Sequence, residues 1–194
     1  MLISQISECA LARWSPGIGD PSPMGWLTVI AYLAAAGLSL ALGAKHERGV
    51  VERLFWAISG AGLLFLAVNK QLDLQSFLTA AGRCAAKLQG WYDMRQTVQL
   101  DFIVILIVIS IAGGACAVWA LRATLRRTGI ALLGLVWLTG FVLVRAIGFH
   151  HVDRLIGLHL AGMRLNWVFE LGGITIFLLG CIIALGTPAR AQSG

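Results

Sequence analysis

The stretch RAIGFHHVDRLIG, residues 145–157, places two adjacent histidines and an aspartate directly after a long apolar run. A histidine titrates near neutral pH, and a neighbouring carboxylate can orient it for proton transfer. Glu170, beyond the next loop, offers a second carboxylate. We therefore expect acid–base chemistry here. The candidate catalytic residues are His150, His151, Asp153 and Glu170.

The same region could instead hold a divalent metal ion. A metal site needs three or four nitrogen or oxygen ligands, with room for a water molecule if it is catalytic. His150 and Asp153 are three positions apart, so they share one face if the segment is helical. Asp73, Asp101 or Glu170 could complete the set from other segments. The sequence contains no HExxH motif. Chemistry with a metal and chemistry without one both stay open. If a metal is bound, we expect His150, Asp153 and Asp73 to be its ligands.

Basic and amide side chains near these residues predict a site for an anionic substrate. Lys70 and Arg145 could bind a phosphate or carboxylate, and arginine offers a planar two-pronged donor. Asn166 lies one helical turn before Glu170, so both could face the same way. The candidate substrate-binding residues are Lys70, Arg145, Asn166 and Asp101.

The composition indicates that lipid surrounds the elements that position these groups. Of 194 residues, 58% are hydrophobic and 12% are charged, which is roughly half the charged fraction of a soluble domain. A helix needs about 20 mostly apolar residues to cross a bilayer. Five segments have that length: Gly25–Ala44, Arg53–Gln71, Phe102–Leu121, Gly129–Phe149 and Trp167–Gly186. The second has a short apolar core, so a four-span arrangement with this segment in the membrane surface stays open.

We predict an all-α, polytopic membrane bundle of about five transmembrane helices. The apolar runs are continuous rather than alternating, which disfavours a membrane β-barrel. Residues 1–24 lack the features of a signal peptide and form a short outer tail, 25–187 form a single transmembrane domain, and 188–194 form a cytoplasmic tail.

Two linking segments predict amphipathic helices on the outer membrane surface. The first carries apolar residues at helical spacing between 74 and 88, with Arg83 and Lys87 placed to reach lipid phosphates. The second has a similar stripe at Val152, Leu155, Ile156, Leu160 and Met163. His159 falls inside that stripe, and we interpret it as a packed, structural histidine.

The basic residues predict the orientation. One side of the membrane carries seven in roughly two dozen positions, and short, strongly basic loops stay cytoplasmic. The amino terminus then faces outward and the carboxyl terminus inward, in a bacterial-type cytoplasmic membrane. The net charge of +6 thus reflects topology, and we expect no nucleic-acid partner.

Counting residues along each span places the polar groups at one depth. Arg145 lies about 6 Å below the outer surface at 1.5 Å per residue, and Glu170 or Asp101 at similar depth is its expected partner. An ionisable group below the headgroups is costly unless it is paired or hydrated. We therefore predict an outer polar pocket supplied by four of the five spans. We expect nothing comparable in the inner half beyond the basic loops.

Four cysteines are too few for a disulfide scaffold. Cys9 and Cys84 both fall on the outer side, where a bond is chemically permitted, but we expect them to remain unbonded. Cys116 and Cys181 are predicted to be small core residues.

The sequence is compatible with three functional hypotheses. The first is a membrane-embedded enzyme that acts on a lipid or lipid-like substrate at the outer leaflet, with membrane lipids as its partners. The second is a non-catalytic subunit of a larger membrane complex, in which the Arg–Glu pairing only holds helices together. The third, a small transporter, needs a continuous polar path that the inner halves of the spans do not offer.

Overall fold

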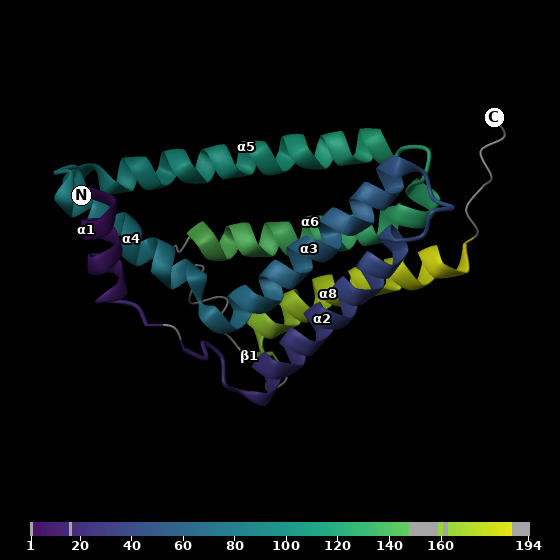
Figure 1. Ribbon diagram of the computed structural model, residues 1–194, viewed down its shortest axis with the longest axis horizontal. Coiled ribbons are helices and arrows are strands. Elements are labelled where there is room, and N and C mark those ends of the chain that lie inside the picture. The colour runs from purple at the N-terminus through teal and green to yellow at the C-terminus, as the bar shows by residue number, and fades with distance from the viewer. Residues whose placement is uncertain (1, 16, 148–158, 161–162, 188–194) are drawn as a thin grey trace.

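The computed structural model describes residues 2–15, 17–147, 159–160 and 163–187 of the chain. Figure 1 shows its elements. They are α1 (Leu2–Leu11), α2 (Pro23–Gly43), α3 (Val50–Leu72), α4 (Leu74–Leu88), the short 3-10 helix η1 (Tyr92–Met94), α5 (Arg95–Leu121), α6 (Leu125–Ile147), β1 (His159–Leu160), β2 (Met163–Arg164) and α8 (Leu165–Gly186).

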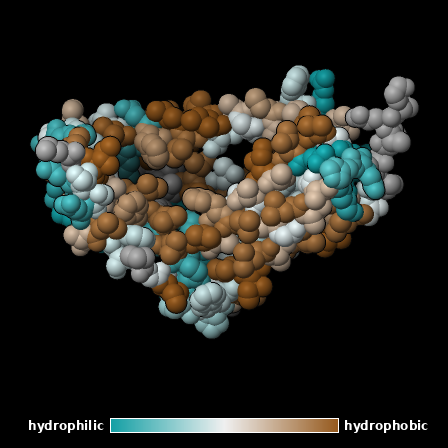
Figure 2. Space-filling view, viewed as in Figure 1, coloured by the Kyte–Doolittle hydropathy of each residue, from teal (hydrophilic) through white to brown (hydrophobic). Residues whose placement is uncertain are grey.

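Five helices are long and apolar enough to cross a membrane: α2, α3, α5, α6 and α8. The predicted five-span, all-α architecture is confirmed. The second expected span is one continuous helix of 23 residues, which favours a crossing over an interfacial helix. Apolar side chains cover the middle of the bundle, and hydrophilic ones gather toward its two extremes (Figure 2).

The helix ends follow from local chemistry. The side chain of Ser22 accepts a hydrogen bond from the Gly25 amide, and Pro23 occupies the first turn of α2, where its missing amide proton costs nothing. Helix α3 ends before Asp73, whose backbone is left-handed with φ 47°. This conformation breaks the helix and lets α4 leave in a new direction (Figure 1).

The core lies between two helix pairs, α2 with α3 and α6 with α8, joined where α2 packs on α8. Tyr32, Trp56 and Phe177 are its largest fully buried side chains. Glycine allows the closest contacts: a Cβ atom at Gly134 would lie 2.6 Å from the Phe177 amide nitrogen, and one at Gly180 would overlap the Ala131 backbone. Small residues let neighbouring membrane helices approach in this way.

Helix α5 stands apart from this core. Only 6% of its candidate span is buried, compared with 33–44% for the other four, and it runs along one edge of the molecule with α6 as its main neighbour (Figure 1). Cys116 lies on this helix and is exposed, so its predicted place in the core is wrong, whereas Cys181 on α8 is buried as predicted.

A disulfide joins α1 to α4, through Cys9 and Cys84. The expectation that these cysteines stay unbonded is therefore wrong. It failed because the amino-terminal segment, for which no element was predicted, contains a helix that packs against α4. The rings of Trp14 and Phe77 meet beside the bond, with centroids 5.1 Å apart. The predicted helix at 74–88 is confirmed, but its apolar face covers α1.

The second predicted surface helix is not found where the chain is described. Leu160 and Met163 of its apolar stripe, together with His159, lie in the two-residue antiparallel pair of β1 and β2. Val152, Leu155 and Ile156 lie outside the described residues.

Candidate functional site

Four spans bring polar side chains together at one end of the bundle, where α2 and α8 begin and α3 and α6 end. We call this the Glu170 end. A cavity of about 270 Å³ opens there. Its polar lining consists of Asp20, Tyr32, Asn69, Lys70, Asp73, Arg145, Arg164, Asn166 and Glu170.

Glu170 lies at the centre of this arrangement and is 4% exposed. The Nζ atom of Lys70 is 2.7 Å from its Oε2 atom, and the hydroxyl of Tyr32 donates to its Oε1 atom at 3.1 Å. Both carboxylate oxygens are thus bonded. A buried charge persists only when it is paired and hydrogen-bonded in this way.

A second carboxylate approaches the same lysine. Oδ2 of Asp20 lies 3.6 Å from Lys70 Nζ and accepts a hydrogen bond from the Trp167 indole at 3.3 Å. Oδ1 of Asp20 accepts from the Ser22 hydroxyl at 2.6 Å. Partial burial raises the pKa of Asp20, but the hydrogen bonds from Ser22 and Trp167 and the charge of Lys70 outweigh burial, so this pKa lies below its usual 3.8.

The segment that carries Asp20 is tied to the end of α3. The Gly19 amide donates to the Gln71 carbonyl at 2.6 Å, and the Gln71 side chain bonds both the amide and the carbonyl of Asp20. A Cβ atom at Gly19 would lie 3.1 Å from the Gln71 carbonyl oxygen. The amino-terminal segment therefore closes one side of the cavity, a role that sequence analysis did not assign to it.

Asn166 and Arg145 complete the lining. The Oδ1 atom of Asn166 is buried and finds no partner among the described residues, so it is an acceptor available to a donor in the cavity. Arg145, near the end of α6, is half-buried and contributes a permanent positive charge.

The structure brings together five of the residues singled out from the sequence: Lys70, Asp73, Arg145, Asn166 and Glu170. Asp101 is not among them, because it is exposed on α5, away from the cavity. The ion pair of Glu170 is made by Lys70, although Arg145 was the expected partner. His150, His151 and Asp153 lie outside the described residues.

Sequence reasoning missed Tyr32, Asp20 and Trp167. Tyr32 could have been found, because a tyrosine in the middle of an apolar span must direct its hydroxyl to a partner. The position of Asp20 carried no such signal, since it depends on how the amino-terminal segment folds back.

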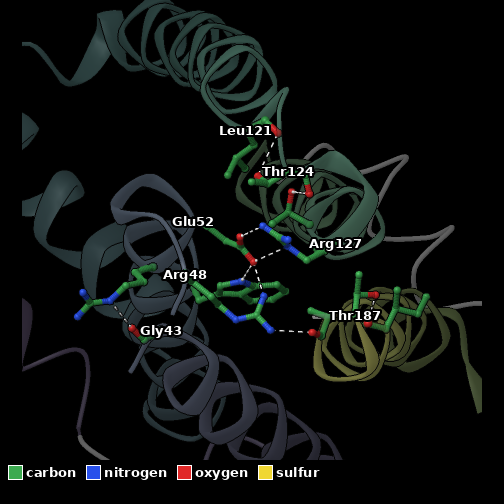
Figure 3. A network of polar contacts seen from close by, with 12 residues as sticks. Gly43, Arg48, Glu52, Leu121, Thr124, Arg127 and Thr187 are labelled. Atoms are coloured by element: carbon green, nitrogen blue, oxygen red, sulfur yellow. Dashed lines mark hydrogen bonds and ion pairs between the residues drawn. The ribbon is translucent and has the colours of Figure 1, made fainter. Parts of the chain in front are cut away.

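The opposite end of the bundle, which we call the Glu52 end, also holds a buried polar cluster. Arg48 and Arg127 both bond Glu52, which is fully buried, and Nη2 of Arg127 lies 2.6 Å from its Oε2 atom (Figure 3). Arg48 also donates to the Ala184 carbonyl of α8 at 2.7 Å. The prediction that this half carries nothing beyond basic loops is wrong. The cluster ties α3, α6 and α8 together.

The two ends therefore differ in chemical capacity. At the Glu52 end every carboxylate oxygen faces an arginine in a packed cluster. At the Glu170 end, a buried carboxylate, a lysine and a tyrosine border an open space that is also lined by arginines and by the amide oxygen of Asn166, which is unpaired in the described part of the chain. Such a site can bind an anionic or hydroxylated molecule and exchange a proton with it. Within the described residues no three His, Cys, Asp or Glu side chains cluster as metal ligands, and the predicted set includes residues beyond them.

The helices and their hydropathy define a multi-pass membrane protein with five candidate spans. Comparison with family models, with curated proteins and with solved structures finds no match to this chain.

Proposed function

We propose that this protein is a membrane-embedded enzyme that acts on a lipid or lipid-like substrate by acid–base chemistry at Glu170. One observation carries the proposal: Glu170 is a buried carboxylate, bonded on both oxygens, that borders a polar cavity at one end of the helical bundle. A purely structural ion pair needs no adjoining cavity.

The roles follow from the contacts. Lys70 and Tyr32 keep Glu170 in place, and Glu170 accepts a proton from a substrate in the cavity or donates a proton to it. Arg145 and Arg164 bind the anionic part of the substrate, and Asn166 accepts a hydrogen bond from it. His150, His151 and Asp153 follow α6 along the chain and supply further acid–base groups. Alternatively, His150 and Asp153, with Asp73, would supply the ligands of a divalent metal ion.

We also propose that the Glu170 end faces outward from a bacterial-type cytoplasmic membrane. The short basic loops belong to the Glu52 end, as expected of cytoplasmic loops. The disulfide supports the same orientation, since α4 extends from the Glu170 end and disulfides persist on the oxidising side of that membrane.

An untargeted lipid comparison of cells with and without the gene tests this function. If the protein is an enzyme of lipid metabolism, one lipid class accumulates in the deletion strain and returns to normal when the gene is restored. Identical lipid profiles in both strains, under conditions in which the protein is present in the membrane, would contradict the proposal.

A non-catalytic subunit is the second candidate, and α5 is the observation that favours it. Its span is almost wholly exposed, and no atom of the described residues lies within 4 Å of a Cβ atom built at Gly113 or Gly114. Small residues on an open helix face suit packing against another membrane helix. Purification in mild detergent separates the candidates, because a subunit elutes with an unlike partner in fixed ratio and the proposed enzyme does not require one.

A further inference from the structure

A second cavity, of about 470 Å³, lies beside the first and shares Asp73 and Arg145 with it. Its lining consists of Arg13, Asp73, Ser76, Thr79, Ala80, Arg83 and Arg145. We propose that this cavity, which we call the arginine cavity, binds a phosphate group. Its volume falls in the range of about 300–1,000 Å³ that is typical of small-molecule sites.

Helix α4 turns its polar face toward this cavity. Ser76, Thr79 and Arg83 are spaced by three and four residues, so they lie on one side of the helix. A neighbouring side of the helix carries Phe77 and Cys84, which contact Trp14 and Cys9 of the amino-terminal segment. The disulfide and the ring contact thus fix the rotation of α4, and with it the side chains that line the cavity.

The charges of the arginine cavity favour an anion. Three guanidinium groups, from Arg13, Arg83 and Arg145, face a single carboxylate, and that carboxylate, Asp73, already accepts a hydrogen bond from Ser76 at 2.6 Å. Within the described part of the chain, no ion pair involves Arg13 or Arg83. Arginine presents paired donors that match phosphate oxygens.

The shared residues connect the two cavities. A phosphate held by the three arginines would border the space in front of Glu170, where the rest of the molecule could extend. If the protein is the enzyme proposed above, a phosphate site here means that its substrate is a phosphate-bearing lipid or a lipid-like phosphate. The same chemistry would recognise free phosphate, so the source has to be resolved by experiment.

Binding to the purified full-length protein in detergent tests the site. Inorganic phosphate is titrated by calorimetry at constant ionic strength, and phosphatidic acid is compared with diacylglycerol, which lacks the phosphate, by native mass spectrometry. Preference for phosphatidic acid over diacylglycerol identifies a lipid headgroup as the ligand, and binding of inorganic phosphate identifies a soluble source. Either outcome supports the site, and binding of neither phosphate compound overturns it.

Substitutions locate the binding. R83Q and R13Q are expected to weaken phosphate binding roughly tenfold or more each, because each removes a charged donor. K87Q is the matched control: Lys87 lies one turn further along α4, is exposed, and stacks over Tyr92 outside the cavity. Unchanged binding by both R13Q and R83Q, with the Cys9–Cys84 bond intact on a non-reducing gel, would overturn the proposal.

E170Q separates this inference from the proposed function. Glu170 lies outside the arginine cavity, so E170Q should bind phosphate as the wild type does while losing lipid turnover. If E170Q retains turnover but R83Q loses binding, the catalytic proposal fails and the phosphate site stands.

Discussion

Lys70 and Glu170 are 100 residues apart in the sequence, yet Nζ of Lys70 lies 2.7 Å from Oε2 of Glu170, and their side chains are 5% and 6% exposed. The pair connects α3 to α8 at one end of the bundle. Neither charge could be buried alone at acceptable cost. The contact that joins these two helices is therefore the same contact that holds the candidate proton-transfer group.

We predict that K70M lowers the free energy of unfolding in detergent by about 3 kcal/mol, because it leaves the Glu170 carboxylate without its cation. The double variant K70M/E170Q should recover part of this loss, since no unpaired charge remains. The two single variants and the double form a cycle that measures the coupling. A coupling energy near zero would mean that the pair contributes nothing to stability.

Removal of the carboxylate at the Glu52 end should be similarly costly. E52Q leaves Arg48 and Arg127, with side chains 3% and 13% exposed, facing a neutral amide, and we expect a loss of roughly 3–5 kcal/mol in thermal or chemical unfolding. E47Q in the preceding loop is the control, because Glu47 is exposed and surface substitutions change stability by less than about 0.5 kcal/mol. Equal melting temperatures for the two variants would contradict a stabilising role for the Arg48–Glu52–Arg127 cluster.

Stability should depend on pH through Asp20. Its pKa is lowered in the folded protein, so its stabilising effect is present above the usual carboxyl pKa of 3.8 and is lost as the pH falls through the lower folded value. The melting temperature of the wild type should therefore fall more steeply on acidification than that of D20N. The difference between the two curves isolates Asp20 from other carboxylates, and parallel curves would show that its ionisation is not linked to folding.

The close approach of α6 and α8 can be tested with two glycines on one helix. G180A places a Cβ atom on the Ala131 backbone, and we expect a loss of about 1–3 kcal/mol. In the described part of the chain, the Cβ atom of G172A meets nothing within 4 Å. This variant should be neutral or stabilising by less than about 1 kcal/mol, because alanine favours the helix. Comparable losses in both variants would indicate that helix packing is not the cause.

The spans were predictable because hydropathy reports the solvent of each segment directly. Asp101 shows the limit of that reasoning. Residue counting placed it at the depth of Glu170, but depth does not determine which helices are neighbours. Helix α5 packs mainly on α6, and Asp101 remains exposed. Tyr32 on α2 takes a place beside Glu170 instead.

The disulfide and the Glu52 cluster were missed for related reasons. Pairing Cys9 with Cys84 required that the amino-terminal segment fold back on α4 as a helix, and a short segment carries little signal for such a long-range contact. Glu52 lies among basic residues, directly before the expected second span of Arg53–Gln71. Its burial depends on Arg127, which lies 75 residues further along the chain.

Proton transfer by Glu170 is tested most directly by lipid turnover in proteoliposomes made with lipids from a strain that lacks the gene. E170Q suits this test because Asp20 stays 3.6 Å from Lys70 and keeps that charge paired, and its melting temperature verifies folding. We predict that the wild type converts the accumulated lipid and that folded E170Q is slower by roughly a hundredfold or more. Turnover by E170Q equal to that of the wild type would contradict a catalytic role for Glu170.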